Sequence, residues 1–281
     1  MKPRFRPLAC ALALAALPSA AQTPKNSGQQ PSPRTNAAAA RVSGPLEAAN
    51  AAPWTNSLGT VFVPVPGTKV WFCIWETREK DYRAFPLAPK PRARLHWEKP
   101  LPAQTPNHPV MEVSWDEAQA FCQWLTKKEQ PTGLLGPKDR YRLPTDAEWS
   151  TAVGLNEPAA GLPVEKDRKI KDLYPWGRQW PPPQGAGNYH PLLQVDRFEH
   201  SAPVGSFKPN QFGIFDLGGN VWEWCEDWYD GRQQERSLRG ASFDNDGYGT
   251  LLSSDRANDA WPVRRRENIG FRVVLARDSL P

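Results

Sequence analysis

The four cysteines carry the most reactive side chains in this chain, and their spacing limits the chemistry they support. Cys10 lies near the N-terminus, whereas Cys73, Cys122 and Cys225 are spread through the rest of the chain. No CxxC pair and no cysteine–histidine cluster occurs, although structural zinc sites group four such ligands closely. We therefore expect no zinc. The last three thiols are predicted to be small buried hydrophobic side chains, with one internal disulfide and one unpaired thiol as the alternative.

The four histidines do not form a metal-binding pattern either. His96, His108, His190 and His200 include no HxxxH-type pair. A lone histidine is more often a surface or hydrogen-bonding residue than a metal ligand. The sequence also has no glycine-rich phosphate loop and no GxSxG nucleophile elbow. Neither nucleotide binding through such a loop nor serine hydrolysis is indicated.

The positive charge of the chain lies outside its predicted folded domain. The chain has 35 Lys and Arg against 30 Asp and Glu, a formal net charge of +5. Residues 1–53 carry this whole excess, so residues 54–281 are electrically balanced. A nucleic-acid-binding protein needs a basic folded surface, and we expect no nucleic acid partner. No apolar run reaches the roughly 18 residues of a membrane-spanning helix, so no membrane span is expected.

The N-terminal region predicts export. Residues 1–21 combine three basic residues, an apolar run over residues 8–17 and small residues at 19–21, which is typical of a secretory signal peptide. A short buried helix is the alternative. Residues 22–53 are rich in Gln, Ser, Pro, Asn and Ala, and they are predicted to form a disordered linker. The protein is therefore expected to be secreted or periplasmic, with a folded domain over residues 54–281.

Local patterns in the domain predict two main helices and several short strands. Ser114 and Glu117 have the spacing of a capping box, and the same pattern recurs at Thr145 and Glu148. Apolar residues follow the first box at the helical period, and Gly154 is a plausible stop for the second helix. Strands are predicted over residues 60–66, 69–75, 237–242 and 270–275. With 13 Trp, 20 Gly and 31 Pro, the expected fold class is α+β and loop-rich, with short antiparallel strands.

Seven sequence blocks identify a family resemblance. They are VSWDEAQAFCQWL (113–125), YRLPTDAEW (141–149), YPWG (174–177), APVGSF (202–207), FGIFDLGGNVWEWCEDW (212–228), LRGAS (238–242) and NIGFRV (268–273). In this order they resemble the formylglycine-generating enzyme, or sulfatase-modifying factor, domain over essentially all of residues 54–281. The resemblance implies a C-type-lectin-like α+β fold with little regular structure and bound calcium.

The resemblance also implies two structural calcium sites. Calcium takes about six to eight oxygen ligands from carboxylates, amides and backbone carbonyls. The residues that match the family's first site are Asn188, Tyr189, Asp196 and Phe198. Those that match the second site are Asp216, Gly219, Val221 and Glu223. The alternative is that Asp196, Asp216 and Glu223 only cap turns.

The chain departs from the family at the catalytic positions. Formylglycine-generating enzymes use two cysteines, five residues apart, whose thiolates bind copper(I) while oxygen oxidises a substrate cysteine. In this sequence the two positions fall at Asn245 and Thr250. Copper(I) prefers soft thiolate ligands, so we expect no copper, no catalytic residues of this type and no formylglycine-generating activity.

The rest of the family groove is expected to bind a ligand. Matching or neighbouring positions, together with the following loop, supply Trp222, Arg239, Ser242, Phe243, Asn245, Tyr248, Arg256 and Asn268. Such a mixture of aromatic and amide side chains is typical of binding loops, although polar side chains also occur where a loop is merely solvated. The leading hypothesis is a binding module for a peptide, protein or small molecule. The alternatives are an oxidoreductase with a different metal site or substrate, and a diversified ligand-binding protein of a retroelement system.

Overall fold

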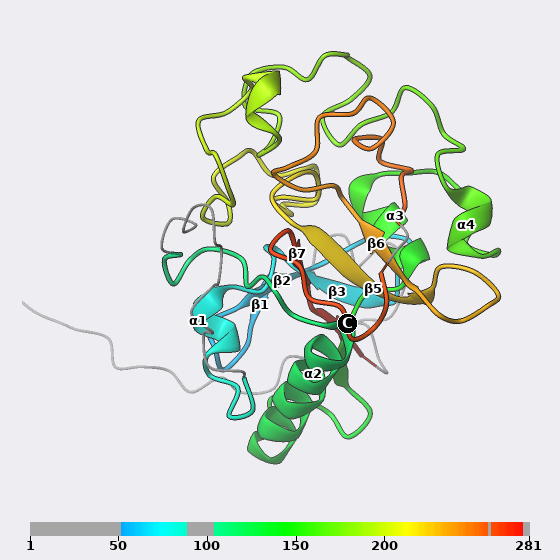
Figure 1. Cartoon of the computed structure of the whole chain (residues 1–281). Coiled ribbons are helices and arrows are strands. Elements are labelled where there is room, and N and C mark those ends of the chain that lie inside the picture. The colour runs from blue at the N-terminus through cyan, green and yellow to red at the C-terminus, as the bar shows by residue number, and fades with distance from the viewer. Residues whose placement is uncertain (1–51, 89–103, 258–259, 278–281) are drawn as a thin grey trace, which may run out of the picture. The chain divides into compact units, whose positions relative to one another are not determined.

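The computed structural model describes residues 52–88, 104–257 and 260–277. The signal peptide expected over residues 1–21 lies outside these ranges, as does nearly all of the linker expected over residues 22–53. The described residues form two β-sheets, four α-helices and long connections (Figure 1). None of these helices has the length and apolar character that crossing a bilayer demands.

The larger sheet joins the two ends of the domain. Its strand order is β1-β2-β3-β8-β4, and every pair is antiparallel. The strands are β1 (Trp54–Thr55), β2 (Val61–Pro64), β3 (Val70–Cys73), β4 (Arg140–Arg142) and β8 (Val274–Ala276). The two strands predicted over residues 60–66 and 69–75 are confirmed as β2 and β3. Because β8 pairs with both β3 and β4, the C-terminal segment lies in the middle of this sheet.

Both main helices begin where the sequence predicts. The helices are α1 (Glu79–Tyr82), α2 (Trp115–Glu129), α3 (Asp146–Val153) and α4 (Pro163–Lys166), with single 3-10 turns at η2 (Gln130–Thr132) and η3 (Pro191–Leu193). At α2 the Glu117 N–H donates to the Ser114 hydroxyl at 3.2 Å, and the Ser114 N–H donates to the Glu117 carboxylate at 3.0 Å. Thr145 and Glu148 make the same exchange at α3. Each box satisfies backbone donors that have no partner inside the helix.

The apolar face of α2 packs into the main core. Phe121 contacts the rings of Tyr82 and Phe271, with centroid distances of 5.6 Å in both cases. Cys122 is buried on the same face. All three cysteines of the described residues are free and buried, so the prediction of small buried thiols is confirmed.

The smaller sheet contains a strand that the sequence patterns did not predict. It has the order β6-β5-β7, with β5 (Trp222–Trp228), β6 (Arg236–Arg239) and β7 (Ile269–Gly270). The first four residues of β5 are all buried, so both of its faces are covered and no alternation of polar and apolar residues marks it. β5 pairs with β7 in parallel, which differs from the antiparallel arrangement of every other strand pair.

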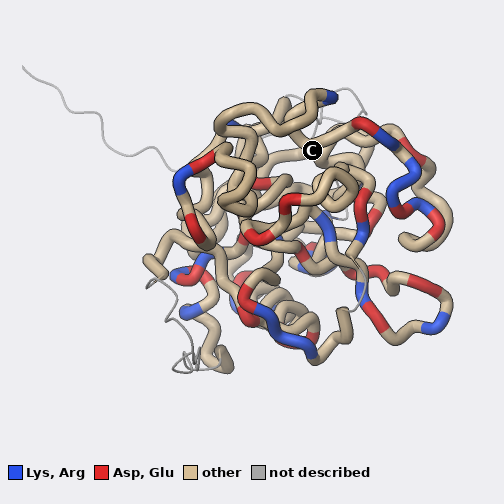
Figure 2. The backbone as a smooth tube through the Cα atoms, turned by 45° about the horizontal axis from the view of Figure 1, so that its top comes forward, with Lys and Arg blue, Asp and Glu red and all other residues tan. Residues whose placement is uncertain are grey.

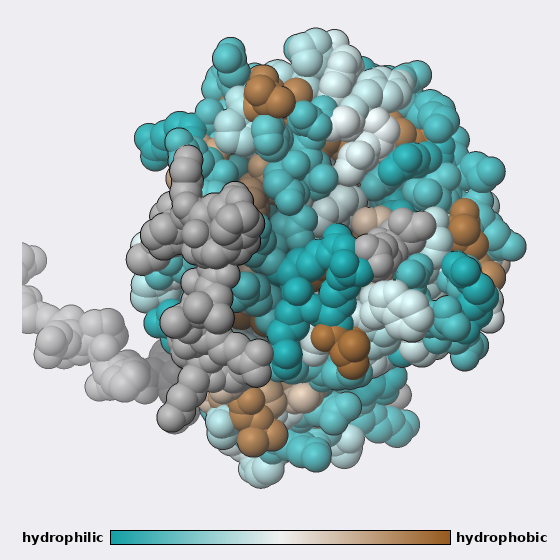
Figure 3. Space-filling model, in the orientation of Figure 1, coloured by the Kyte–Doolittle hydropathy of each residue, from teal (hydrophilic) through white to brown (hydrophobic). Residues whose placement is uncertain are grey.

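Long loops connect α3 to β5 and carry most of the candidate site. Between Gly154 and Val221 the only regular elements are α4 and η3, and Figure 1 shows this stretch looping beyond β5 and β6. On the face drawn in Figure 3, hydrophilic residues predominate and hydrophobic residues form separate small patches.

Candidate functional site

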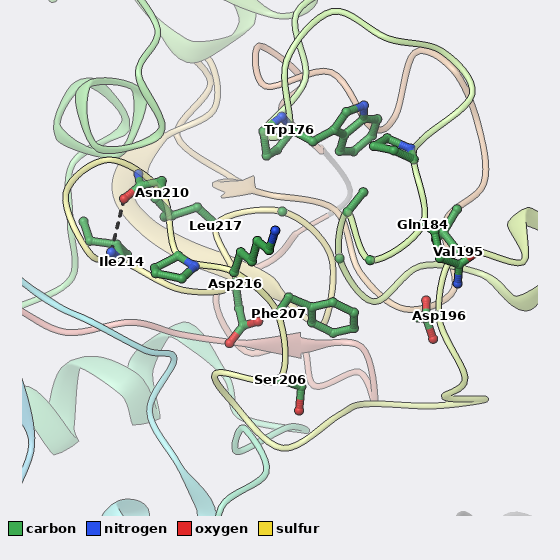
Figure 4. A pocket seen from close by; sticks show the side chains of 18 of the residues that line it. Trp176, Gln184, Val195, Asp196, Ser206, Phe207, Asn210, Ile214, Asp216 and Leu217 are labelled. Atoms are coloured by element: carbon green, nitrogen blue, oxygen red, sulfur yellow. Dashed lines mark hydrogen bonds between the residues drawn. The ribbon is translucent and has the colours of Figure 1, made fainter.

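The loops before β5 enclose a pocket of about 1020 Å³ (Figure 4). We call it the loop pocket. Ligand pockets commonly have volumes of roughly 300–1,000 Å³, so it has room for a drug-sized molecule. Its lining residues include Trp176, Gln184, Asp196, Arg197, Phe198, Ser206, Phe207, Lys208, Asn210 and Asp216.

The side chains around the loop pocket are chemically mixed. Figure 4 shows Phe207 beside Asp216, with Trp176 across the opening. Arg197 and Lys208 add positive charge to the lining, and Asp196 adds a second carboxylate. Aromatic surface together with a few polar groups is the usual composition of a small-molecule site.

The first expected calcium group is assembled at one side of this pocket. The Asp196 carboxylate accepts hydrogen bonds from the Tyr189 N–H at 3.0 Å and from the Phe198 N–H at 2.8 Å. These bonds hold three of the four expected ligand residues together, and Asn188 directly precedes Tyr189 in the chain. The Asn188 Oδ1 atom is buried and has no hydrogen-bond partner in the structure. A buried acceptor without a partner is costly, and a bound cation would satisfy it.

The second expected group lies where the chain enters β5. Asp216 has a positive φ of 56°, and one of its carboxylate oxygens accepts from the Gly205 N–H at 2.7 Å. Burial, with a smaller contribution from the nearby Glu223, raises the pKa of Asp216 to about 6. Glu223 is paired with Arg272 at 2.6 Å and accepts from the Trp149 indole N–H at 3.0 Å. This carboxylate is therefore already stabilised without a metal.

Glu76 is a third buried carboxylate in the same region, and sequence reasoning missed it. It accepts from the Asn220 side-chain amide at 2.6 Å and from the Val221 N–H at 3.2 Å. Burial raises its pKa well above the usual range, and Asp216 and Glu223 raise it further. A single glutamate three residues after a strand carries no local signal, because its partners lie about 145 positions away.

The carboxylates do not form a compact cluster. Within the described ranges, no three His, Cys, Asp or Glu side chains converge closely enough to hold a metal ion. A cation at either group would therefore need amide and backbone carbonyl oxygens as well, which is how calcium is commonly held. The unpartnered Asn188 Oδ1 and the Asp196 and Asp216 carboxylates supply such oxygens, whereas both oxygens of Glu223 already accept from Arg272.

The two expected calcium groups are joined directly. The Asn220 N–H donates to the Asn188 carbonyl at 2.8 Å, and the Asn188 side-chain amide donates to Asn220 Oδ1 at 3.1 Å. Gly219 packs so closely that a Cβ atom there would lie 2.3 Å from the Asn188 carbonyl oxygen. Gly219 also has a φ of +81°, a conformation that residues with a Cβ rarely adopt. Both the close approach and the positive φ therefore require glycine at position 219.

Replacing Gly219 with alanine should therefore destabilise the domain strongly. Gly59 is a matched control, because its φ is +73° but nothing lies within 4 Å of a Cβ placed there. Gly59→Ala should cost about 1–2 kcal/mol from backbone strain alone, and Gly219→Ala should cost clearly more. Urea denaturation of both variants measures the difference. Equal losses of unfolding free energy would show that the close contact with Asn188 is unimportant.

Two of the expected groove residues are buried in the interior. The exposed fractions of Arg239 and Arg256 are 0% and 1%. Both guanidinium groups donate to the Asp146 carboxylate, at 2.7 Å and 3.0 Å. The expectation that these arginines line a groove is therefore corrected. Their charges are engaged by a buried carboxylate, and neither side chain offers a surface to a ligand.

The other expected groove residues do not line the loop pocket either. Trp222, Ser242 and Phe243 are buried. The Ser242 hydroxyl donates to Asn245 Oδ1 at 2.7 Å, and the Asn268 amide donates to Asp244 at 3.0 Å.

Tyr248 remains accessible, with 44% of its surface exposed. Its ring meets Trp180 at 5.3 Å and Tyr174 at 5.8 Å. Tyr174 in turn stacks on Trp176, which also lines the loop pocket. A chain of rings thus connects the expected binding loop to the loop pocket.

Comparison with known proteins identifies the family of this chain. The family described as "Sulfatase-modifying factor enzyme 1-like domain" matches residues 71–277, and the chain belongs to it. The chain is 30% identical over 214 residues to a formylglycine-generating enzyme of Streptomyces coelicolor, an alignment that covers 65% of this chain and 59% of the relative. It is 32% identical over 187 residues to an inactive C-alpha-formylglycine-generating enzyme 2 of Bos taurus, covering 62% of this chain and 52% of that protein.

These alignments span only part of each relative, between about half and three fifths of its length. Among solved structures, PvdO from Pseudomonas aeruginosa superposes with a TM-score of 0.52 at 24% identity, covering 74% of this chain and 80% of that one. At that level of identity the likeness concerns the fold alone.

Proposed function

We propose that this chain is an exported, calcium-stabilised ligand-binding module that lacks formylglycine-generating activity. The observation that carries the proposal is the chemistry at the two positions that the family resemblance assigns to catalytic cysteines. They are Asn245 and Thr250, and neither side chain provides a thiolate for copper(I). Export rests on the signal peptide predicted over residues 1–21.

The cysteines elsewhere in the described residues do not replace the missing pair. Cys73, Cys122 and Cys225 are all buried. Burial raises the pKa of Cys73 to about 12 and raises the pKa values of the other two thiols as well. A buried thiol that stays protonated is neither a nucleophile nor a metal ligand. The bovine relative, which is named inactive, is consistent with a member of this family that lacks the activity.

Two observations support structural calcium. The unpartnered Asn188 Oδ1 is a ready oxygen ligand beside the Asp196 carboxylate. Asp216, Glu76 and Glu223 bring three buried carboxylates into one region, where Arg272 is the cation that lowers the pKa of Glu76 and of Asp216. A divalent cation at each group would offset this negative charge and join the loops that build the pocket.

The loop pocket supports the binding role. Trp176, Phe198 and Phe207 supply rigid aromatic area, and Arg197 and Lys208 supply donors for an acidic or polar ligand. A peptide, a protein segment or a small molecule fits this composition. Fixing the loops with calcium would hold the pocket open before a ligand arrives and so reduce the entropy lost on binding.

An aldehyde assay tests the absence of catalysis. The purified chain is loaded with copper(I) and incubated in air with a cysteine peptide that an active formylglycine-generating enzyme, run in parallel, converts. We expect no aldehyde from this chain and no stoichiometric copper(I). The double variant Asn245→Cys, Thr250→Cys is the matched comparison, and it should gain copper(I) binding. Aldehyde formation by the unmodified chain would refute the proposal.

A further inference from the structure

A second pocket, of about 600 Å³, lies at an edge of the larger sheet. It shares no lining residue with the loop pocket. Its walls come from the end of α2, the turn before the edge strand β4, and the ends of β3 and β8. We call it the basic pocket, and it is lined by Lys69, Thr126, Gln130, Pro137, Lys138, Asp139, Arg140, Arg142, Ala276 and Arg277.

The basic pocket concentrates positive charge. Five of its lining residues are Lys or Arg, and Asp139 is the one acidic residue among them. Residues 54–281 as a whole are electrically balanced, and Figure 2 shows blue and red positions interspersed along much of the backbone. Like charges at close range repel. Glu148 and Glu226 offset the charge of Arg142, and an anion bound in the cavity would reduce the repulsion among the other cations.

Several of these cations have unused binding capacity. Lys69 and Arg140 are exposed, and within the described part of the chain neither has an ion-pair partner. Arg277 lies 5.1 Å and 5.3 Å from the ring centroids of Trp54 and Trp71. Its Nε atom is buried without a hydrogen-bond partner in the structure, and its contact with Asp139 is 3.9 Å long. A buried donor without a partner is costly, so the contact with Asp139 does not fully satisfy the Arg277 guanidinium.

The geometry points to the class of ligand. Guanidinium groups bind phosphate oxygens in a planar, two-pronged arrangement, and the five cations spread around this cavity can contact more than one phosphate group. A volume of 600 Å³ falls in the middle of the range of roughly 300–1,000 Å³ for small-molecule sites, more than a single phosphate requires. We propose that the basic pocket binds a molecule that carries two or more phosphate groups. Such groups occur in soluble phosphorylated compounds and in clustered lipid headgroups.

Calorimetric titration of the chain with tripolyphosphate tests the proposal. Lys69→Gln with Arg140→Gln should weaken binding at least tenfold, because two exposed cations of the pocket are removed while the core is untouched. Lys69→Arg with Arg140→Lys should keep the affinity within a few fold, since the charges remain. The matched control is Lys80→Gln on α1 with Arg83→Gln directly after it, which removes the same charge outside the pocket and should leave binding unchanged. Unchanged thermal unfolding of every variant excludes misfolding as the cause.

Sedimentation with vesicles distinguishes the source of the phosphates. Binding of tripolyphosphate assigns a soluble ligand, whereas binding only to phosphatidylglycerol vesicles, and not to phosphatidylcholine vesicles, assigns a lipid headgroup. In either case the variant that replaces Lys69 and Arg140 with glutamine must bind the probe more weakly than the unmodified chain. The proposal is overturned if neither probe binds at low salt, or if the control on α1 weakens binding equally. Equal affinity for orthophosphate and tripolyphosphate would overturn the requirement for several phosphate groups.

Discussion

Replacing Asp146 with alanine is expected to destabilise the domain more than any other single change considered for this chain. The Asp146 side chain, 1% exposed, receives hydrogen bonds or ion pairs from Arg239, Arg256 and Lys166 at 2.7–3.1 Å. Removing it leaves three cations close together in the interior. Breaking a buried ion pair by deleting one partner costs about 3–5 kcal/mol, a large part of a typical unfolding free energy of about 5–15 kcal/mol.

Urea denaturation measures this loss, and Asp116 provides the control. Asp116 is an exposed carboxylate in the first turn of α2, so Asp116→Ala should cost at most about 1 kcal/mol through the helix dipole. If Asp146→Ala does not fold, Asp146→Asn is used, because it keeps the shape while removing the charge. A loss of similar size for Asp116→Ala and Asp146→Asn would contradict the central role of this carboxylate.

The same network predicts a dependence on pH. Burial alone would raise the pKa of Asp146, but Arg239 and Arg256 hold it below its usual range. A carboxylate with a lowered pKa in the folded state stabilises the protein fully above its unfolded value, which is about 3.9 for Asp. That stability is lost as the pH falls from about 4 through the lower pKa of the folded state. The stability difference between the unmodified chain and Asp146→Asn should therefore be constant from pH 7 to 5 and shrink below pH 4.

Removing calcium is expected to have an effect of comparable size. If each of the two sites is saturated at about a hundredfold excess over its dissociation constant, each contributes about 2.7 kcal/mol to stability. EGTA should therefore lower the melting temperature, and calcium should restore it. Magnesium should not substitute well, because it prefers a strict octahedral shell and loses water reluctantly.

Single variants assign this effect to the two loops. Asp196→Asn should remove one equivalent of calcium in metal analysis, and Asp216→Asn should remove the other. The Asn188–Asn220 hydrogen bonds connect the loops, so each variant should also weaken calcium binding at the remaining site. If the purified chain contains no calcium and EGTA does not change its melting temperature, the calcium proposal is wrong. The aldehyde assay would still test the absence of catalysis independently.

The parts of the fold that the sequence predicted correctly depend on local interactions. The starts of α2 and α3 are predictable from Ser114 and Thr145, because the residues that complete their capping boxes lie three positions further on. The strands β2 and β3 are consecutive and pair through a short turn. In contrast β5 was missed, because its residues Trp222–Cys225 are buried on both faces by segments that are remote in sequence.

The candidate site was less predictable for the same reason. Arg239 follows a recognisable family motif, but its burial depends on Asp146, which lies 93 residues earlier. Glu76 has no local pattern at all, yet it meets Asn220 across 144 positions. The residue types at these positions are visible in the sequence, whereas their exposure and their partners are not.

The family resemblance, the starts of both main helices and the absence of thiols at positions 245 and 250 follow from residue identity and short spacing, so they are visible in the amino-acid sequence. Three other features emerge only in the folded molecule: Arg239 and Arg256 are interior ion-pair partners, the loop pocket forms beside Asp196 and Asp216, and five cations surround a second pocket. Burial and electrostatic pairing depend on distances in space, and these distances are set when segments tens to hundreds of residues apart pack together.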